Sequence, residues 1–245
     1  MKYTTATTTP ARLGYRMPAE WEPHEATWIA WPHNRDDWPG KFQSIPAVYA
    51  DMVRHLVRGE RVRIIVNDAA HQRSAERTLR QAHVPLDNVE FFRWKTDRVW
   101  TRDSGPIFVT RKEAPKLAIT HWQFNGWAKY RNYKKDEKLP TQIAHKLGVT
   151  TWQPELIVNG RPWRIVLEGG SIDVNGVGTM LTTEECLLSD IQQRNPDLKR
   201  EQLEQAFADY FGIKKTIWLG NGVAGDDTHG HVDDISRFVS ANTVV

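Results

Sequence analysis

The chain has 245 residues, of which 33 are basic and 30 acidic, and 40% are hydrophobic. This length and composition fit a globular protein with a sizeable core, and the net charge of +3 gives no reason to expect a nucleic-acid or membrane partner. The single cysteine, Cys186, excludes an internal disulfide framework and a multi-cysteine zinc site, and it suits a reducing compartment. We therefore expect a cytoplasmic protein.

We expect no targeting signal at the beginning of the chain. Residues 1–15 are rich in threonine and lack the apolar core that a signal peptide needs, and no long apolar run follows them. We expect residues 1–16 to form a flexible tail. We expect residues 17–245 to form a single domain, because no proline-rich linker or break in composition divides them.

Helix-like segments alternate with short β-rich segments along the chain. Residues 47–66, 139–152 and 197–219 each have the pattern of a helix, a glycine and a strand. Three apolar residues of the first segment fall on one face of a helix: Val48, Met52 and Leu56. The recurrence predicts repeated α/β units, although the segments are not a sequence repeat in the strict sense.

Local signals indicate where these helices begin and end. Gly59, Gly148 and Gly212 suit the left-handed residue that follows a helix. Asp68 and Asp197 suit the N-cap position, where a side-chain oxygen accepts a hydrogen bond from the first turn.

Three further stretches each bring a carboxylate close to small residues or a histidine, just before a β-rich run. They are TRDSGPIFV (101–109), LEGGSIDV (167–174) and GHVDDISRFV (230–239). The dipeptide Asn175-Gly176, which directly follows the second stretch, is a strong signal for a β-hairpin. We expect the repeated units to deliver these acidic loops to one place.

The stretch GDDTHGHVDD (225–234) holds four carboxylates and two histidines in ten positions. It is compatible with a metal site, with a pocket for an organic cation, or with a solvated acidic loop. The spacing of His229, His231 and Asp233 could present metal ligands from one face of a strand. The rest of the chain offers no obvious fourth ligand, so the metal site is the weaker interpretation.

Taken together and in this order, the motifs resemble the agmatine deiminases of the bacterial-type peptidyl-arginine deiminase family, which are guanidine-modifying enzymes. The resemblance covers essentially the whole chain after the tail. It rests on MPAEWEPHEATWIAWPHN (17–34), WTRDSGP (100–106), THWQFNGW (120–127), LEGGSIDVNG (167–176) and GDDTHGHVDD (225–234).

The resemblance implies a pentein-type α/β-propeller, with pseudo-symmetric ββαβ units around a central active site. We expect this propeller to be incomplete at its C-terminus, because the chain stops within the β-rich run SRFVSANTVV (236–245). The implied reaction is the hydrolysis of agmatine to N-carbamoylputrescine and ammonia, a step of putrescine biosynthesis and polyamine metabolism. The resemblance implies no metal or other cofactor, and it is compatible with a homodimer.

The chemistry of a guanidinium explains the acidic loops. This planar cation presents its N–H donors in a fixed fork, and carboxylates are its natural partners. By their positions in the motifs, Asp103 and Asp233 are expected to hold the guanidinium, and His231 to act as general acid and base. Glu168 is expected to pair with His231 and to favour its charged form. Trp100 is a candidate wall along the aliphatic chain of the substrate, although packing beneath the loop explains it equally well.

The family attacks the guanidinium carbon with a cysteine thiolate, which forms a covalent amidino intermediate. The resemblance implies that this cysteine lies in a glycine-rich loop beyond residue 245. Cys186 is expected to be a small buried residue instead, because the neighbouring Glu184 and Glu185 would raise the pKa of its thiol. We therefore expect residues 1–245 to carry the binding acids and the histidine without the nucleophile.

Two other functions stay open on the residues alone. The first is an arginine or peptidyl-arginine deiminase, because no motif marks the groups that would recognise the far end of the substrate. The second belongs to another class: a non-catalytic protein that binds guanidines and has lost its nucleophile.

Overall fold

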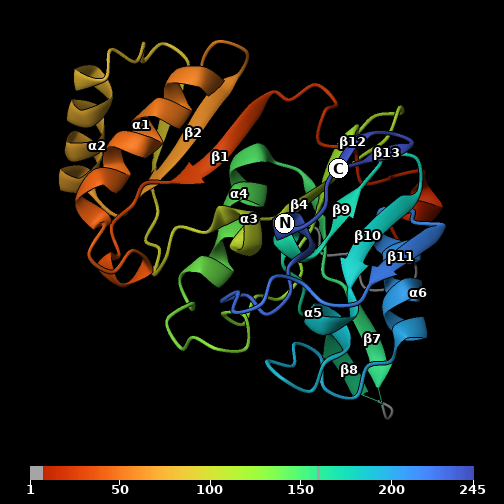
Figure 1. Cartoon of the computed structure of the whole chain (residues 1–245). Coiled ribbons are helices and arrows are strands. Elements are labelled where there is room, and N and C mark those ends of the chain that lie inside the picture. Colours follow the sequence, from red (N-terminus) through yellow and green to blue (C-terminus); the bar gives the residue numbers. More distant parts are fainter. Residues whose placement is uncertain (1–7, 159–160) are drawn as a thin grey trace. The chain divides into compact units, whose positions relative to one another are not determined.

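The computed structural model describes residues 8–158 and 161–245, and these form two compact units (Figure 1). Unit 1 takes the chain up to Glu22, Arg102–Arg131 and Glu137–Val245, and unit 2 takes Pro23–Thr101 and Asn132–Asp136. Each unit has a hydrophobic core of its own. The single domain expected for residues 17–245 stays a prediction.

Unit 2 is a parallel three-stranded sheet, in the order β1-β2-β3, packed against two helices that lie side by side (Figure 1). Strand β2 is buried along nearly its whole length, as expected for the central strand of a covered parallel sheet. The strands and α-helices of this unit are β1 (Ala26–Ala30), α1 (Ile45–Leu56), β2 (Arg61–Val66), α2 (Ala69–Gln81) and β3 (Val89–Arg93).

Of the three apolar residues expected on the packed face of α1, Leu56 packs against the core of unit 2, whereas Val48 and Met52 do not. Val48 and Met52 are 51% and 43% exposed, whereas Ala50 and Val53 are fully buried. Close packing against α2 and the sheet favours the smaller side chains of α1, because shape and volume decide which residues fit a core.

Unit 1 contains two sheets with the same connectivity. In each, a hairpin is followed by a helical segment and by a third strand parallel to the second, which gives the ββαβ order that the resemblance implied. The first sheet uses β4 (Ile107–Thr110), β5 (Leu117–Thr120), α4 (Leu139–Leu147) and β6 (Thr150–Trp152). The second uses β9 (Asp173–Val174), β10 (Thr179–Thr183), α5 (Glu184–Leu188), α6 (Arg200–Phe211) and β11 (Lys215–Leu219).

Shorter elements complete unit 1. Two antiparallel pairs are formed by β7 with β8 and by β12 with β13. Three short helical turns, α3, η5 and η6, each precede a strand. Helix α3 begins at Thr101, the last residue of unit 2 before the chain returns to unit 1. The bounds are α3 (Thr101–Ser104), β7 (Glu155–Val158), β8 (Arg161–Arg164), η5 (Gly169–Ser171), η6 (Val232–Asp234), β12 (Phe238–Ser240) and β13 (Thr243–Val244).

Three of the five predicted helix ends are confirmed. The carboxylate of Asp68 accepts a hydrogen bond from the backbone N–H of His71 at 2.8 Å and so caps α2. Gly148 and Gly212 follow α4 and α6 with φ values of 65° and 71°, in the left-handed region that glycine adopts without steric cost.

The other two predicted helix ends are wrong. Helix α1 ends at Leu56, three residues before Gly59. Asp197 does not cap α6, because it adopts a left-handed backbone with a φ of 69° before the helix begins. Lys199 holds the N-cap position instead, and its backbone N–H donates to the side chain of Gln202 at 2.9 Å.

The hairpin predicted at Asn175-Gly176 is confirmed between β9 and β10. The connection is longer than a two-residue turn and runs from Asn175 to Gly178. The side-chain oxygen of Asn175 accepts hydrogen bonds from the backbone N–H groups of Val177 and Thr179, which stabilises this wider loop.

Part of the expected N-terminal tail, residues 1–7, lies outside the described residues. The following residues pack on unit 1. Ala11–Leu13 forms a short 3-10 helix, and Tyr15 is buried in the core of the unit, with its hydroxyl donating to the carbonyl of Pro115 at 2.6 Å.

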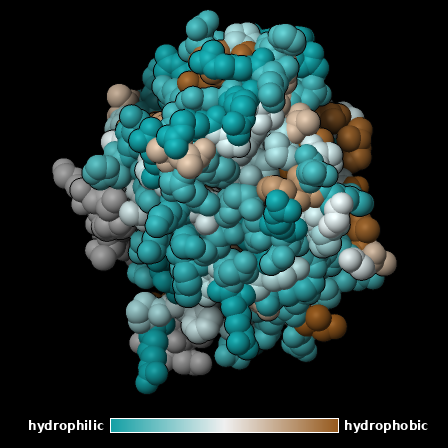
Figure 2. Space-filling model, turned by 90° about the vertical axis from the view of Figure 1, so that its left-hand side faces the viewer, coloured by the Kyte–Doolittle hydropathy of each residue, from teal (hydrophilic) through white to brown (hydrophobic). Residues whose placement is uncertain are grey.

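The surface that Figure 2 displays is largely hydrophilic, and its hydrophobic atoms gather in small groups. Within the described part of the chain, the helices are all too short or too polar to span a bilayer.

Candidate functional site

The three acidic loops end in the same part of unit 1. Asp103 lies in α3, Glu168 directly precedes η5 and His231 directly precedes η6. Each of these helical turns comes shortly before a strand of unit 1, and η5 and η6 lie against each other. The expectation that the repeated units deliver these loops to one place is met by the described residues.

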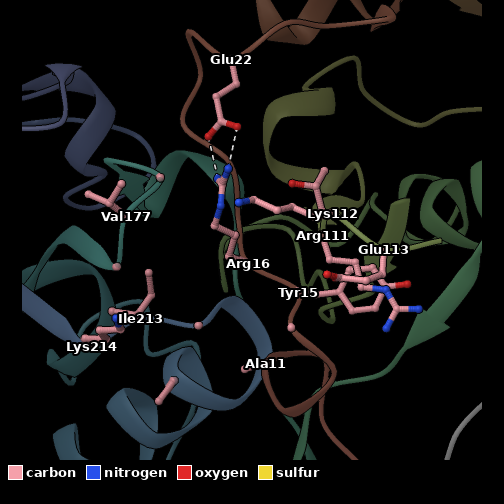
Figure 3. A pocket seen from close by; sticks show the side chains of 16 residues that line it. Ala11, Tyr15, Arg16, Glu22, Arg111, Lys112, Glu113, Val177, Ile213 and Lys214 are labelled. Carbon is pink, nitrogen blue, oxygen red and sulfur yellow. Dashed lines mark hydrogen bonds and ion pairs between the residues drawn. The ribbon is translucent and has the colours of Figure 1, made fainter. Parts of the chain in front are cut away.

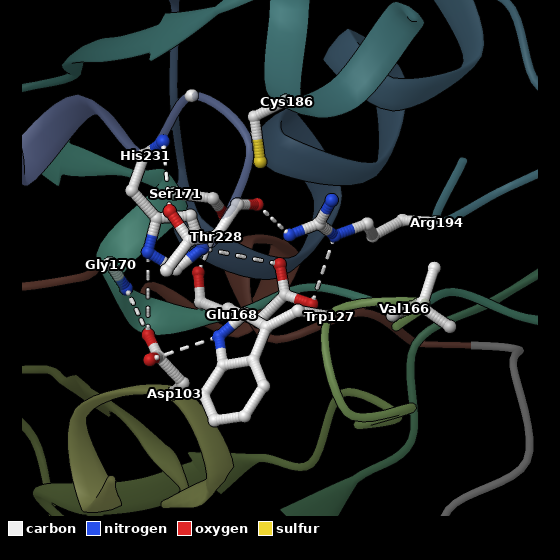
Figure 4. A network of polar contacts seen from close by, with 12 residues as sticks. Asp103, Trp127, Val166, Glu168, Gly170, Ser171, Cys186, Arg194, Thr228 and His231 are labelled. Atoms are coloured by element: carbon white, nitrogen blue, oxygen red, sulfur yellow. Dashed lines mark hydrogen bonds and ion pairs between the residues drawn. The ribbon is translucent and has the colours of Figure 1, made fainter. Parts of the chain in front are cut away.

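His231 lies at the centre of this cluster (Figure 4). Its Nδ1 atom is 3.7 Å from Asp103 Oδ1 and 3.9 Å from Asp233 Oδ1. Its Nε2 atom is 3.5 Å from Glu168 Oε2, which is longer than an ordinary hydrogen bond, and neither atom has a closer hydrogen-bond partner among the described residues. The four residues expected to be catalytic are thus brought together, although 130 positions separate Asp103 from Asp233 (233 − 103).

Asp103 is held rigidly in this arrangement. The backbone N–H of Gly170 donates to Asp103 Oδ1 at 3.1 Å, and the indole N–H of Trp127 donates to Asp103 Oδ2 at 3.2 Å. A Cβ atom on Gly170 would overlap the imidazole of His231, and one on Gly169 would overlap the carbonyl oxygen of Arg102. The two glycines therefore allow the loops to approach closely enough for the cluster to form.

Asp233 is more accessible, with 20% of its side chain exposed, and it belongs to a network of charged residues. Its Oδ2 atom is 3.6 Å from Arg102 Nε and 3.8 Å from Arg237 Nη1. Both arginines also form ion pairs with Glu20. One carboxylate oxygen of Asp233 therefore faces these arginines, while the other faces His231.

Burial and charge act in opposite directions on His231 and Asp103. Burial alone would lower the pKa of His231, but Asp103, the sulfur of Cys186 and Glu168 together outweigh it and raise that pKa well above its ordinary value. Burial raises the pKa of Asp103 to about 6, although the adjacent His231 opposes this shift. The cluster therefore favours an imidazolium at neutral pH, beside a carboxylate that readily accepts a proton.

Glu168 has a buried cation as its second partner. Its side chain and that of Arg194 are both 0% exposed, and Arg194 Nε donates to Glu168 Oε1 at 3.2 Å. Burial would raise the pKa of Glu168, but the charges of Arg194 and His231 prevail and lower it. Glu168 is therefore held as a carboxylate.

The contrast between two buried histidines gives a direct test of these charges. We expect His231 to be protonated at pH 6, because its neighbours raise its pKa. His121 should be neutral at the same pH, because burial and the nearby Arg164 lower its pKa to about 4. Side-chain ¹⁵N NMR of the labelled chain reports the charge of each imidazole. A neutral His231 at pH 6 would show that its pairing with the carboxylates is not formed.

Cys186 is buried in α5, and its thiol points toward Glu168 and His231 (Figure 4). Burial raises the pKa of the thiol, as expected, but the expected cause was wrong. Glu184 pairs with Arg200 instead, and Glu185 accepts a hydrogen bond from the backbone of Gly222.

A metal ion has a candidate set of ligands here, because donor atoms of Glu168, Cys186 and His231 all lie within 4.8 Å of one another. The guanidinium of Arg194 and the raised pKa of His231 both oppose binding of a cation at this set. His229 does not join these residues, since it faces Glu185 at 3.7 Å in a turn rather than a strand. The expectation that the protein needs no metal stays a prediction.

Trp100 lies in unit 2, where it is 39% exposed and its ring packs against Trp38 at a centroid distance of 5.6 Å. The described contacts agree with a role in packing. Its expected role beside the substrate stays a prediction.

A separate cavity of about 920 Å³ opens elsewhere in unit 1 (Figure 3). Its charged lining residues are Arg16, Glu22, Arg111, Lys112, Glu113 and Lys214. Arg16 is engaged by Glu22, and Arg111 stacks on the ring of Tyr15. None of the expected site residues lines this cavity, so its size does not make it the candidate site.

Sequence reasoning missed two side chains that complete the cluster, Trp127 and Arg194. Trp127 lies within one of the quoted motifs, and only its ring N–H marks it as a donor for a buried carboxylate. Arg194 lies in a loop where a basic residue is ordinarily solvated, and no signal in the sequence indicates its burial.

Comparison with known proteins gives consistent matches. The family model described as Porphyromonas-type peptidyl-arginine deiminase matches residues 16–245. The chain is 34% identical to the agmatine deiminase of Ectopseudomonas mendocina over 247 residues, which cover 99% of this chain and 62% of that protein. It is also 34% identical to an agmatine deiminase of Pseudomonas aeruginosa over 244 residues, which cover 98% of this chain and 62% of the relative.

Solved structures agree with these matches. The agmatine deiminase of Enterococcus faecalis has a TM-score of 0.85 and 30% identity, and the match covers 99% of this chain and 63% of that one. An agmatine deiminase from C. jejuni with substrate bound has a TM-score of 0.77 and 29% identity, and the match covers 94% and 63% of the two chains.

The expected fold class is confirmed by these structures, which are α/β proteins of the pentein propeller type. The chain spans about 62% of the length of the curated relatives that it matches. On the family model and on the identity over nearly its whole length, this chain belongs to the Porphyromonas-type peptidyl-arginine deiminase family.

Proposed function

We propose that the chain provides the guanidinium-binding and acid–base part of a cytoplasmic agmatine deiminase, which converts agmatine and water to N-carbamoylputrescine and ammonia in putrescine biosynthesis. The observation that carries this proposal is the convergence of Asp103, Glu168 and Asp233 on His231. The names of the relatives support it, because several are agmatine deiminases.

In this proposal the carboxylates bind and orient the substrate. The guanidinium lies between Asp103 and Asp233, whose oxygens pair with its N–H donors and fix its plane. A cation of this kind favours the ionised form of Asp103, whose burial otherwise favours the protonated acid. Agmatine fits this pairing because its guanidinium stays charged throughout the physiological pH range.

His231 moves the protons of the reaction. As an imidazolium held by Glu168, it gives a proton to the departing ammonia when a thiolate has added to the guanidinium carbon. The neutral imidazole then takes a proton from the water that attacks the amidino intermediate, and N-carbamoylputrescine and the thiolate are released. The raised pKa of His231 supports its starting role as the acid.

The thiolate nucleophile is not Cys186 in this proposal. Full burial and a raised pKa keep Cys186 in the unreactive thiol form, and a nucleophile needs the opposite environment. The nucleophile is a cysteine in the glycine-rich loop that the family resemblance implies, outside residues 1–245. Cys186 packs beneath the cluster instead.

Binding and turnover assays on the purified chain test the proposal. We expect residues 1–245 to bind agmatine in isothermal titration calorimetry and to release no ammonia from it, with Cys186 intact or changed to alanine. Turnover that disappears in Cys186→Ala would overturn the assignment of Cys186. Turnover that survives the change would show that the chemistry needs no cysteine here.

Binding and turnover assays also distinguish the agmatine deiminase from the two alternative functions. Tighter binding of arginine or of a peptidyl-arginine would favour the corresponding deiminase. Binding of agmatine by a complete gene product that does not hydrolyse it would favour a non-catalytic guanidine-binding protein. A homodimer is a further proposal from the family resemblance, and sedimentation velocity tests it.

A further inference from the structure

Arg194 is the cation that the proposed reaction leaves unexplained. It lies in the loop between α5 and α6, and its side chain is completely buried. Taking a guanidinium out of water costs several kcal/mol unless its donors are satisfied, so such residues are rare in protein interiors. A buried arginine beside the acid–base cluster therefore calls for a reason.

The donors of Arg194 join three segments of unit 1 (Figure 4). Its Nε atom donates to Glu168 Oε1 at 3.2 Å, and its Nη1 atom donates to the carbonyl of Gln192 at 2.9 Å. Its Nη2 atom donates to the carbonyl of Thr228, three residues before His231. One guanidinium thus holds both the loop of Glu168 and the loop that carries His231.

The two oxygens of Glu168 are divided by this contact. Oε1 is bound by Arg194, whereas Oε2 faces His231 Nε2 and has no hydrogen-bond partner among the residues that the structure describes. The anchored oxygen fixes the plane of the carboxylate, so the free oxygen is directed at the imidazole.

We propose that Arg194 is a positioning residue for the acid–base pair: its guanidinium keeps Glu168 ionised and directed at His231, and it fixes the loop of His231 through Thr228. The catalytic meaning of this role rests on the proposed deiminase function, but the contacts themselves do not. Arg194 acts on the imidazole through Glu168 and through the backbone of the histidine's own loop.

The charges around Glu168 indicate what loss of Arg194 would do. The groups that face Glu168 are Arg194, His231 and the thiol of Cys186, with Asp103 on the far side of the imidazole. Two buried carboxylates are therefore matched by two cations. Without Arg194 the cluster carries an excess negative charge, and burial then favours uptake of a proton by Glu168.

Three variants separate this role from simple filling of space. Arg194→Met keeps most of the volume and removes the charge, and Arg194→Lys keeps the charge without the fork of donors. Arg164→Met is the control, since Arg164 donates to the carbonyl of His121 at 2.8 Å, in another loop of unit 1. All are compared with the parent chain by NMR with ¹³C-labelled glutamate and ¹⁵N-labelled histidine.

We expect Arg194→Met to shift the titration midpoint of the Glu168 carboxyl upward, above its ordinary range, and to change the titration of His231 with it. Arg194→Lys should return the Glu168 midpoint toward that of the parent, and Arg164→Met should leave it unchanged. Unchanged titration of both Glu168 and His231 in folded Arg194→Met would overturn the proposal.

A measurement on the parent chain covers the case in which Arg194→Met does not fold. The ¹H–¹⁵Nε resonance of Arg194 should be protected from exchange with water and should move with the same midpoint as the Glu168 carboxyl. A resonance that does not respond to that titration would overturn the proposal. Agmatine binding to the parent chain is measured separately, so its absence would count against the proposed function and not against the role of Arg194.

Discussion

Asp103→Asn should weaken the binding of agmatine by more than about tenfold, because removal of one partner from a buried charge pair costs about 2–5 kcal/mol. Asp103 is 8% exposed, so water compensates little for the lost carboxylate. The amide keeps the size of the side chain, but its single oxygen can accept a hydrogen bond from the indole of Trp127 or from the backbone N–H of Gly170 and not from both, so part of the loss comes from this contact. Isothermal titration of the purified variant with agmatine measures the loss.

The pH dependence of binding distinguishes this charge from a general disturbance of the site. The pKa of Asp103 is raised to about 6, and only the ionised carboxylate attracts a guanidinium. Affinity for agmatine should therefore fall as the pH drops below about 6 in the parent chain, and this dependence should be reduced in Asp103→Asn. Asp209→Asn, on α6, is the control and should bind like the parent. Equal affinity of Asp103→Asn and the parent at pH 7 would contradict the assigned role.

Glu168→Gln should lower the free energy of unfolding by about 3–5 kcal/mol, since it leaves the buried cation Arg194 without its partner. Glu184→Gln is a matched control, because Glu184 also pairs with an arginine, Arg200, but on the surface. Exposed ion pairs of this kind contribute about 0–1 kcal/mol. Urea denaturation at pH 7 compares the two variants. Equal losses of unfolding free energy would show that burial does not strengthen the contribution of the pair between Glu168 and Arg194.

The stability of the parent chain should also change with pH in a direction set by Glu168. Its pKa is lowered in the folded protein from an ordinary value of 4.5. The resulting stabilisation is fully present above 4.5 and is lost as the pH falls through the folded pKa. Glu168→Gln should lack this contribution, so the difference in unfolding free energy between parent and variant should shrink under acid conditions.

Local rules in the sequence predicted several features of the fold because neighbouring residues decide them. The cap at Asp68, the left-handed glycines after α4 and α6, and the hairpin at Asn175 depend only on a few adjacent residues. The packed face of α1 was not predictable in this way. It depends on which side chains fit against α2 and the sheet, and these contacts are made by residues distant in sequence.

The candidate site likewise contains residues that the sequence predicted and one whose role only the folded structure shows. Asp103, Glu168, His231 and Asp233 stand in recognisable motifs, so the sequence alone was enough to expect their convergence. Arg194 has no such motif, and its importance follows from its burial and from donors directed at two other loops. Burial of a charged side chain is a property of the folded chain, and the amino-acid type alone argues against it.

The adjacent glycines 169 and 170 have a consequence for heritable variation. The space beside each is already filled, by the carbonyl oxygen of Arg102 and by the side chains of His231 and Asp103. Any single-base change that alters a glycine codon adds at least one carbon atom at that position or stops translation. A single-base change in either of these two consecutive codons is therefore silent, stops translation or displaces the acid–base cluster. This holds although neither glycine takes part in the chemistry.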